Sequence, residues 1–405
     1  MRDPRSERDR RQRATDGIGT RAVHAGDALN NSSALTPPIW QSSTFRLESC
    51  SQGAEFAHAT APAAFYTRWG NPTTKQLEAI LADLEGAEAA LALSSGMAAL
   101  STLVLSCVRT GDHVLVGRSI YSGVHELARN VLPRFGVESD SVDTQDIDSV
   151  RAAIRPTTRL LLVESPTNPT LEICDLAALA DACREHGVLS VVDNTFATPY
   201  NQNPIAFGVD VVVHAATKGI GGHSDLTAGA ICSRREVIDR CWPFLKVLGA
   251  CLSPFEAWLA IRGIKSLPLR VARQNETAGA IAEFLAAHRA VDSVHYPGLE
   301  SHARHELARR QMRGFGSMLA FEVRGGAAVG ARFAESLRLV ELAVSLGGAE
   351  TIISHPASMS HASLDDEALR RAGLSPGLLR LSVGLEDARD LIADLEQALA
   401  SAVRA

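Results

Sequence analysis

The sequence predicts an α/β protein built around a mainly parallel β-sheet, and two observations carry this prediction. Apolar runs rich in Val and Leu recur without polar alternation, as expected for strands that are buried on both faces of a parallel sheet. Helical segments separate these runs, and strands that alternate with helices require right-handed βαβ crossovers. Because 405 residues are too many for one simple core, we expect two domains, or one large domain with an appendage.

The composition of the chain favours a small molecule as its ligand. Charged residues make up 21% and hydrophobic residues 46%, and the net charge of -6 gives no sign of a surface for nucleic acid or an anionic membrane. The seven cysteines include no C-x-x-C pair, which indicates reduced thiols and a cytoplasmic location. His302 and His305 form an H-x-x-H pair without further ligands at a suitable spacing, so we expect no metal.

Two segments share only part of the pattern of a targeting or membrane segment. Residues 1–15 are rich in arginine but lack an apolar stretch, so we expect a disordered tail rather than a signal peptide or a membrane anchor. The uncharged run Ala89–Val108 has the length of a membrane span. Because Ser94, Ser95 and Gly96 interrupt this run, a strand, a turn and a buried helix are the better interpretation.

The first 70 residues are expected to form the tail and an arm that has no core of its own. Thr36–Ile39 and the polar run Ser49–Gly53 are typical of extended structure. The arm ends in F-Y-T-R-W-G-N-P-T, where alternation along an extended segment would place Tyr66 and Arg68 on the same side. A phenol beside a guanidinium suits a phosphate group, although a single Tyr-x-Arg is more often plain surface.

A helix is expected from Thr74, and it should end at Gly86 because glycine is typical of helix C-termini. One of its faces is apolar, with Leu77, Ile80, Leu81 and Leu84. The strand Ala89–Leu93 follows, and after a serine-glycine turn a second helix begins near Met97. The backbone N–H groups of Gly96 and Met97 would lie at the N-terminus of this second helix, which is either an anion site or an ordinary tight turn.

Polar residues stand at the carboxyl ends of the next strands of the expected sheet. These strands are predicted at His113–Val116, Arg159–Glu164, Val188–Thr195 and Val211–Val213, with a helix at Leu176–Glu185 between the second and the third. Asn168 lies just beyond one strand, Asp193 lies on the next, and Lys218 follows the last. Ligands of parallel sheets bind at the carboxyl edge, so the convergence of these three residues predicts an active site there.

The lysine is the most informative of the three. It stands in D-V-V-V-H-A-A-T-K-G-I-G-G-H-S-D, directly after a buried strand. An amine in apolar surroundings has a lowered pKa and can form a Schiff base with an aldehyde such as pyridoxal phosphate. A dinucleotide-binding glycine pattern is disfavoured because its third glycine would fall on Ser224. The lysine of an isolated Lys-Gly more commonly lies on the surface and caps a glycine turn. Asn168 and Asp193 at the neighbouring strand ends favour the other interpretation, in which Lys218 forms the Schiff base.

The remaining residues of the predicted site suit the other parts of that cofactor. Asp193 offers a carboxylate that keeps a pyridinium nitrogen protonated. Tyr121, in R-S-I-Y-S-G, offers an aromatic ring that can stack on the cofactor. The phosphate would find donors in Tyr66, Arg68, Gly96, Met97 and Thr217.

The C-terminal part of the chain predicts a smaller α/β layer. A helix capped by Ser253 is expected to end at Gly263, and it is followed by a long helix over Ala272–Ala287 and a strand over Met318–Val323. Within L-L-R-L-S, Arg380 would be buried, which is costly unless the guanidinium is paired with a ligand carboxylate or with a protein carboxylate. The expected domains are therefore 1–70 for the tail and arm, 71–265 for the large domain and 266–405 for the C-terminal domain.

Several long strings resemble one family of enzymes, from about Thr20 to the end of the chain. They are Y-T-R-W-G-N-P-T, S-S-G-M-A-A-L, V-V-D-N-T-F, A-A-T-K-G-I-G-G-H-S-D, S-P-F-E-A-W-L-A-I-R-G-I-K-S-L, S-L-G-G-A-E-T-I-I-S-H-P-A-S-M-S-H and L-R-L-S-V-G-L-E-D. Together they are similar to the cystathionine γ-synthase and methionine γ-lyase family of pyridoxal phosphate enzymes. This resemblance implies an aspartate-aminotransferase-like fold of type I, with a mainly parallel seven-stranded sheet and a smaller C-terminal domain.

The resemblance also implies an assembly and a role for each site residue. The protein would be a homotetramer formed from two dimers, in which Tyr66 and Arg68 reach the phosphate site of the neighbouring subunit. Lys218 would bind the cofactor covalently and transfer protons, while Tyr121 would stack on the ring and act as an acid or base. The other implied contacts are those of Asp193 with the pyridine nitrogen, Asn168 with the ring oxygen, Gly96, Met97 and Thr217 with the phosphate, and Ser345 and Arg380 with the substrate carboxylate.

The chain departs from the usual family pattern close to the lysine and the tyrosine. Ala215 stands where a phosphate-binding serine is usual, and Gly219 stands where an aromatic residue is common. Gly123 replaces the cysteine of methionine γ-lyases. Glu126 stands where many cystathionine-handling members have arginine, whereas Val344 matches methionine γ-lyases rather than the glutamate of those members.

These features predict a carbon-sulfur lyase of sulfur amino acid metabolism. The expected reaction is a methionine γ-lyase-like elimination that gives a thiol, a 2-oxo acid and ammonia. The alternatives are a γ-replacement enzyme, such as cystathionine γ-synthase or O-acylhomoserine sulfhydrylase, and a cystathionine β- or γ-lyase. The substrate would thus be a sulfur or O-acyl amino acid. A binding protein without catalysis is disfavoured because Lys218, Asp193 and Arg380 are all present.

Overall fold

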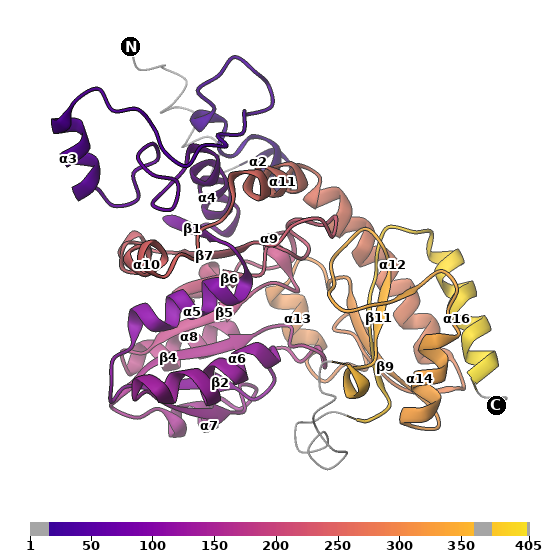
Figure 1. Cartoon of the computed structure of the whole chain (residues 1–405). Helices are drawn as coiled ribbons and strands as arrows, with labels where there is room; N and C mark the ends of the chain where they lie inside the picture. The colour runs from indigo at the N-terminus through magenta and orange to yellow at the C-terminus, as the bar shows by residue number, and fades with distance from the viewer. Residues whose placement is uncertain (1–15, 360–374, 403–405) are drawn as a thin grey trace.

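The protein consists of two α/β units that lie side by side, as the computed structural model of residues 16–359 and 375–402 shows (Figure 1). The larger unit is organised around a seven-stranded sheet, and the smaller one around a five-stranded sheet. The tail expected over residues 1–15 lies outside the described residues. No helix in the described ranges is long and apolar enough to cross a membrane.

The seven-stranded sheet has the order β1-β7-β6-β5-β4-β2-β3 and is parallel except for β7, which runs antiparallel to both of its neighbours. This confirms the prediction of a mainly parallel sheet, because its central strands are the apolar runs found in the sequence. The strands are β1 (Ala89–Leu93), β2 (His113–Gly117), β3 (Glu138–Val142), β4 (Thr158–Glu164), β5 (Leu189–Asp193), β6 (Val211–His214) and β7 (Gly229–Ser233).

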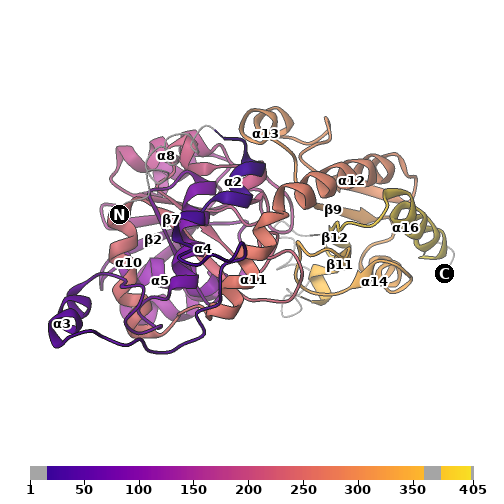
Figure 2. The same cartoon turned by 90° about the horizontal axis from the view of Figure 1, so that it is seen from above.

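Helices cover both faces of this sheet, which explains why its strands do not alternate between apolar and polar residues (Figure 2). One face packs on α5 (Gly96–Cys107) and α10 (Arg235–Leu248). The opposite face packs on α4 (Pro72–Glu85), α8 (Leu176–Glu185) and α11 (Pro254–Lys265). The remaining helices of this unit are α2 (Ile18–His24), α3 (Cys50–His58), α6 (Ser122–Glu126), α7 (Ile147–Ala153) and α9 (Thr198–Asn201).

The smaller sheet has the order β10-β11-β12-β9-β8 and carries the C-terminal helices. A separate core joins this sheet to α12 (Leu267–Ala287), α14 (Ala327–Glu335) and α16 (Ala388–Ala402). Ser354 of β11 and Arg380 of β12 line a cavity together with residues of the large unit. The strands are β8 (Val291–His295), β9 (Met318–Val323), β10 (Glu341–Leu342), β11 (Ile352–Ser354) and β12 (Leu378–Ser382), and α13 (His305–Gln311) precedes β9.

The N-terminal arm differs from the extended structure that the sequence predicted. Residues Cys50–His58 form α3, which projects away from the body of the larger unit (Figure 1). The hydroxyl of Ser49 caps this helix by accepting the N–H of Gln52, a signal hidden within a polar run. Residues 66–69 form a turn rather than an extended segment, since the N–H of Trp69 donates to the carbonyl of Tyr66.

The end of one helix was also predicted incorrectly, because packing outweighs local preference there. Helix α11 continues through Gly263 to Lys265. Gly263 is a glycine because a Cβ atom there would lie 2.3 Å from the carbonyl oxygen of Gly221, in the loop that follows the lysine. Its role is close approach, not helix termination.

We predict that Gly263→Ala lowers stability by about 1–3 kcal/mol, because the new methyl group forces α11 away from the backbone of Gly221. The matched control is Gly279→Ala in α12, where a Cβ atom meets nothing within 4 Å. This control should gain about 0.5–1 kcal/mol from the higher helix propensity of alanine. Urea unfolding of both variants at one protein concentration measures the difference, and equal effects of the two would contradict the packing argument.

Candidate active site

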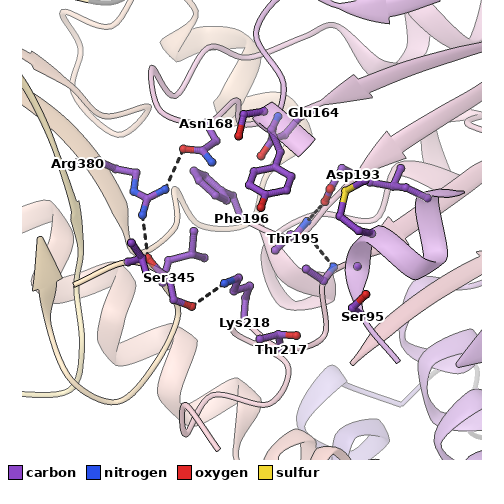
Figure 3. A pocket seen from close by; sticks show the side chains of 18 of the residues that line it. Ser95, Glu164, Asn168, Asp193, Thr195, Phe196, Thr217, Lys218, Ser345 and Arg380 are labelled. Carbon is purple, nitrogen blue, oxygen red and sulfur yellow. Dashed lines mark hydrogen bonds between the residues drawn. The ribbon is translucent and has the colours of Figure 1, made fainter. Parts of the chain in front are cut away.

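A cavity of about 510 Å³ lies at the carboxyl edge of the large sheet, between the loops after β4, β5 and β6 and the smaller sheet (Figure 3). Most of the residues predicted from the sequence line this cavity. They are Gly96, Met97, Tyr121, Asn168, Asp193, Thr217, Lys218, Ser345 and Arg380. The convergence predicted from the strand ends is therefore present in the fold, while the role of each residue stays a prediction.

Strand register explains why these side chains meet. Strands β4, β5 and β6 are parallel, and Asp193 pairs with Glu164 on one side and with Val213 on the other. The three strands thus end at nearly the same level. Helix α5 begins at the same edge, where Ser95 caps it by accepting the N–H of Ala98. The first N–H groups of a helix have no acceptor within the helix, so Gly96 is placed to bind an anion.

Lys218 is held by the smaller unit. Its Nζ donates to the hydroxyl of Ser345 over 2.6 Å. Burial, and secondarily the positive charge of Arg380, lower the pKa of Lys218 below its ordinary value. Ser345 adopts a φ of 85°, in the left-handed region that disfavours residues other than glycine. This conformation directs its hydroxyl to Lys218 while its carbonyl accepts from Arg380.

Arg380 enters the cavity from β12 without a carboxylate partner among the described residues. Its Nη1 donates to the Asn168 side chain over 3.0 Å, and its Nη2 donates to the Ser345 carbonyl over 2.8 Å. Its Nε is buried and has no hydrogen-bond partner in the described structure. Burial lowers the pKa of Arg380 to about 10. The protein ion pair that the sequence left open is thus not formed here, which leaves a cationic fork facing the cavity.

Asp193 is a buried carboxyl group at the end of β5. It accepts the N–H of Thr195 over 3.0 Å, as the close-up shows (Figure 3). Burial raises the pKa of Asp193, while the hydrogen bonds from Thr195 and the nearby His214 act in the opposite direction. A carboxylate in this position suits a cationic ring nitrogen, because the positive charge of the ring would offset the cost of burial.

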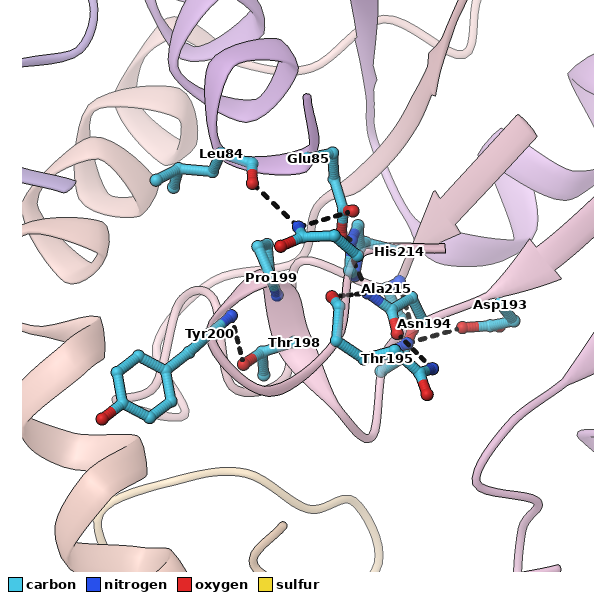
Figure 4. A network of polar contacts seen from close by, with 12 residues as sticks. Leu84, Glu85, Asp193, Asn194, Thr195, Thr198, Pro199, Tyr200, His214 and Ala215 are labelled. Carbon is cyan, nitrogen blue, oxygen red and sulfur yellow. Dashed lines mark hydrogen bonds and ion pairs between the residues drawn. The ribbon is translucent and has the colours of Figure 1, made fainter. Parts of the chain in front are cut away.

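A buried histidine–glutamate pair, His214 and Glu85, lies near Asp193 (Figure 4). Nε2 of His214 lies 2.5 Å from Oε1 of Glu85, and both side chains are almost completely inaccessible to solvent. The side-chain amides of Asn194 and Asn203 also donate to Glu85. Sequence reasoning missed this pair, although a histidine after three valines and a glutamate at a helix end were visible signals.

The ring of Tyr121 lies at the mouth of the cavity and is 45% exposed. Gly123 gives this ring its space, since a Cβ atom there would lie 2.7 Å from Cε1 of Tyr121 and 3.0 Å from Sδ of Met97. The backbone N–H of Tyr121 donates to Oε2 of Glu164 over 2.8 Å. Ala215 and Val344, which the sequence marked as departures from the family pattern or as matches to one branch of it, also line the cavity. The lining residues that were not singled out as candidates in the sequence are Ser95, Leu100, Ser122, Glu164, Thr195, Phe196, Leu346, Ser354 and Met359.

Tyr66 and Arg68 do not line the cavity of their own chain. The Arg68 guanidinium stacks over the Tyr66 ring, with 5.2 Å between Cζ and the ring centroid. Arg68 Nη1 also donates to the carbonyl of Lys246. The two side chains meet as the sequence predicted, but through a turn, and contact with a phosphate would require a neighbouring subunit.

The H-x-x-H pair has a structural explanation. Nε2 of His302 lies 3.1 Å from the carbonyl of Leu171, and Nδ1 of His305 lies 2.8 Å from the carbonyl of Pro297. Both rings therefore hold loops together. Within the described ranges, no group of three or more His, Cys, Asp or Glu side chains is arranged to hold a metal ion.

The chemistry of the cavity fits pyridoxal phosphate. An amine of lowered pKa suits the aldehyde, the Asp193 carboxylate suits the ring nitrogen, and a helix N-terminus suits the phosphate. Arg380, which has no carboxylate at ion-pair distance among the described residues, suits the carboxylate of an amino acid. Each part of the cofactor and of an amino acid thus has a complementary group in the cavity.

Comparison with known proteins points in the same direction. Residues 19–400 match the family described as Cys/Met metabolism PLP-dependent enzyme. The L-methionine gamma-lyase of Fusobacterium nucleatum subsp. nucleatum is 45% identical over 95% of this chain and 98% of its own length. The cystathionine beta-lyase of Lactococcus lactis subsp. cremoris is 41% identical over 94% and 98%. The solved cystathionine gamma-lyase from Lactobacillus plantarum superposes with a TM-score of 0.90 at 39% identity, covering 96% of this chain and all of that one (100%).

We predict that Arg380→Gln shifts the pH dependence of cofactor capture by Lys218 upward. The positive charge of Arg380 lowers the pKa of Lys218, so its removal raises that pKa and reduces the neutral amine at a given pH. The rate at which the apoprotein captures pyridoxal phosphate, trapped with borohydride, measures the shift. Arg273→Gln on the surface is the control, and an unshifted profile for Arg380→Gln would refute the coupling.

We predict that Glu85→Ala destabilises the protein by about 3–5 kcal/mol, because buried His214 loses its partner and the side-chain amides of Asn194 and Asn203 each lose one of two acceptors. Glu85→Gln should cost less, since its carbonyl still accepts. The control is Glu236→Ala, which removes an exposed pair with Arg240 and should cost about 0.5 kcal/mol or less. Urea unfolding provides the measurement, and similar losses for Glu85→Ala and Glu236→Ala would contradict the prediction.

Proposed function

Because the chain belongs to the Cys/Met metabolism PLP-dependent enzyme family, we propose that it eliminates the thiol from methionine or a closely related sulfur amino acid. It is a pyridoxal phosphate-dependent carbon-sulfur lyase of sulfur amino acid metabolism. The observation that carries the narrower proposal is the 45% identity, over nearly the whole chain, to L-methionine gamma-lyases such as that of Pseudomonas putida. The products would be a thiol, a 2-oxo acid and ammonia.

Each residue of the cavity would have a separate role in this reaction. When bound, pyridoxal phosphate supplies an electron sink for the carbon that loses its proton. Asp193 would hold the ring nitrogen, and Asn168 would contact the ring oxygen. Gly96, Met97 and Thr217 would bind the phosphate, and Tyr121 would stack on the ring. Lys218 would bind the aldehyde carbon and then remove and return protons at the substrate α- and β-carbons.

Arg380 and Ser345 would bind the substrate carboxylate and so select an α-amino acid. The guanidinium offers a bidentate fork and already has both outer nitrogens oriented by Asn168 and Ser345. Tyr121 would give its proton to the leaving thiol, since its ring lies at the mouth of the same cavity. This arrangement would place an acid and a base on different sides of the reacting carbon chain.

A second candidate is cleavage of cystathionine, and a third is replacement at the γ-carbon of an O-acylhomoserine. Cleavage of cystathionine is favoured by the 41% identity to a cystathionine beta-lyase. Glu126 and Val344 speak against it, because cystathionine-handling members resemble one another in an arginine and a glutamate at these positions. The narrow substrate thus depends on residues around Tyr121 and Ser345 rather than on the cofactor site.

We further propose a homotetramer built of two dimers, located in the cytoplasm. The support for shared active sites is that Tyr66 and Arg68 lie outside the cavity of their own chain. In the assembly they would contact the phosphate in the neighbouring subunit. We also propose domain limits of 1–70, 71–265 and 266–405, the last boundary falling at the end of α11.

The proposed function is tested with three substrate mixtures: L-methionine, L-cystathionine, and an O-acylhomoserine with sulfide. We expect release of a thiol, a 2-oxo acid and ammonia from methionine, measured by thiol titration and 2-oxo acid assay. Lys218→Ala is the control. This variant should show no turnover, and borohydride should trap no cofactor on it. A dominant replacement product without elimination from methionine would exclude the proposal.

A further inference from the structure

The cavity contains a second buried carboxyl group, which the roles described above do not use. Glu164 is the last residue of β4, and only 3% of its surface is exposed. It lines the cavity and lies level with Asp193 in the register between β4 and β5. A buried carboxyl group is costly, and none of the ion pairs formed within the described ranges includes Glu164, so its contacts with neighbouring groups need an explanation.

The contacts of Glu164 lead to the two residues that would touch the cofactor ring from this side. Its Oε2 accepts the N–H of Tyr121 over 2.8 Å. The backbone N–H of Asn168 also faces the carboxyl group. In the close-up, Glu164 lies next to Asn168, at the end of the cavity opposite Lys218 (Figure 3). One carboxyl group thus fixes the backbones on which both side chains are mounted.

Tyr121 needs this fixation more than a buried aromatic residue would. Tyr121 is 45% exposed, so its ring has less packing to restrain it than a buried ring has. Its backbone precedes α6, a helix of only five residues, and its own side chain makes no capping hydrogen bond. The ring lies against the backbone of Gly123, where a Cβ atom would be 2.7 Å from Cε1, so residue 123 adds no side chain that could hold the ring. The bond to Glu164 is therefore a main constraint on the position of the ring.

We propose that Glu164 is a positioning residue that holds Tyr121, and with it the loop of Asn168, in place over the cofactor ring. The proposal rests on the proposed function for the presence of the cofactor, but not on which sulfur amino acid is cleaved. Glu164 acts through Tyr121 and does not itself touch the substrate. Nothing else in the cavity offers an acceptor to this N–H in the described structure.

The charge state of Glu164 follows from the groups that face it. Burial, and then the negative charge of Asp193 on β5, raise the pKa of Glu164 well above its ordinary value. Arg380 on β12 and the two backbone N–H groups oppose this rise. The neutral acid is thereby more favoured than in an exposed glutamate, and both forms of the carboxyl group can accept the N–H of Tyr121. Glutamine matches that neutral form in shape and charge, whereas aspartate is one carbon too short to reach.

Three variants test the proposal: Glu164→Gln, Glu164→Asp and Glu164→Ala. The dissociation constant of pyridoxal phosphate from the apoprotein is measured by quenching of tryptophan fluorescence, and the geometry of the bound cofactor by its circular dichroism. We expect Glu164→Ala and Glu164→Asp to weaken binding about tenfold or more and to alter the dichroism. Glu164→Gln should stay within about threefold of the natural protein. If Glu164→Ala does not fold, the contrast between Gln and Asp remains decisive.

A double-mutant cycle with Tyr121→Ala separates positioning from simple stabilisation. If Glu164 acts mainly through the ring, Glu164→Ala should weaken cofactor binding much less once the ring is absent, and the remaining effect would come from the loop of Asn168. The matched control is Asp394→Ala, another buried carboxyl group that accepts backbone N–H bonds, from residues 338–340. It should lower stability without weakening cofactor binding.

Two outcomes would overturn the proposal. One is an additive double mutant, and the other is a Glu164→Gln variant as defective as Glu164→Asp. Neither outcome depends on the substrate panel, because cofactor affinity and dichroism are measured without substrate. A protein that cleaves no sulfur amino acid but shows the expected cycle would contradict the proposed function alone.

Discussion

Buried charge at the carboxyl edge of the seven-stranded sheet is the constraint on which the site depends. A charge in such a place must be paired or hydrogen-bonded, or its pKa shifts until it is neutral. Glu85 meets this condition through His214 and two amides. Lys218 and Asp193 meet it only in part, and their pKa values are displaced by burial. Lys218, Asp193 and Arg380, whose charges are incompletely satisfied by the protein, all face the cavity.

The same constraint links the two units. Arg380 belongs to the smaller sheet, yet its hydrogen-bond partners are Asn168 of the large unit and the carbonyl of Ser345. Lys218 in turn reaches across to the hydroxyl of Ser345. Ser345 accepts both bonds only because its backbone takes a left-handed conformation. The energetic cost of that conformation is offset by these two hydrogen bonds, which join Lys218 and Arg380 to the same residue.

The sequence predicts the parts of this arrangement that leave local patterns. The strands β1, β2, β4, β5 and β6 are apolar runs, and Asn168, Asp193 and Lys218 follow them at fixed positions. The edge strand β3 was missed because it is mostly polar, and β7 because a short stretch that begins with glycine carries little strand signal. Helix α3 was missed because its cap lies in a polar run. The contact between Glu85 and His214 leaves no local pattern, because 129 residues separate them in the sequence and they come together only in the folded chain.

The departures from the family pattern near the lysine also have a physical basis in close packing. A Cβ atom on Gly96 would lie 2.7 Å from that of Ala215, so the strand end and the helix start are already in contact. A side chain at Gly219 would meet Thr198 at 2.9 Å, and Gly347 packs directly on the backbone N atom of Gly219. A residue larger than glycine at position 219 would therefore require the Thr198 side chain to move. The backbone around Lys218 is held by contact with the loop of Gly347, which is the loop that also carries Ser345.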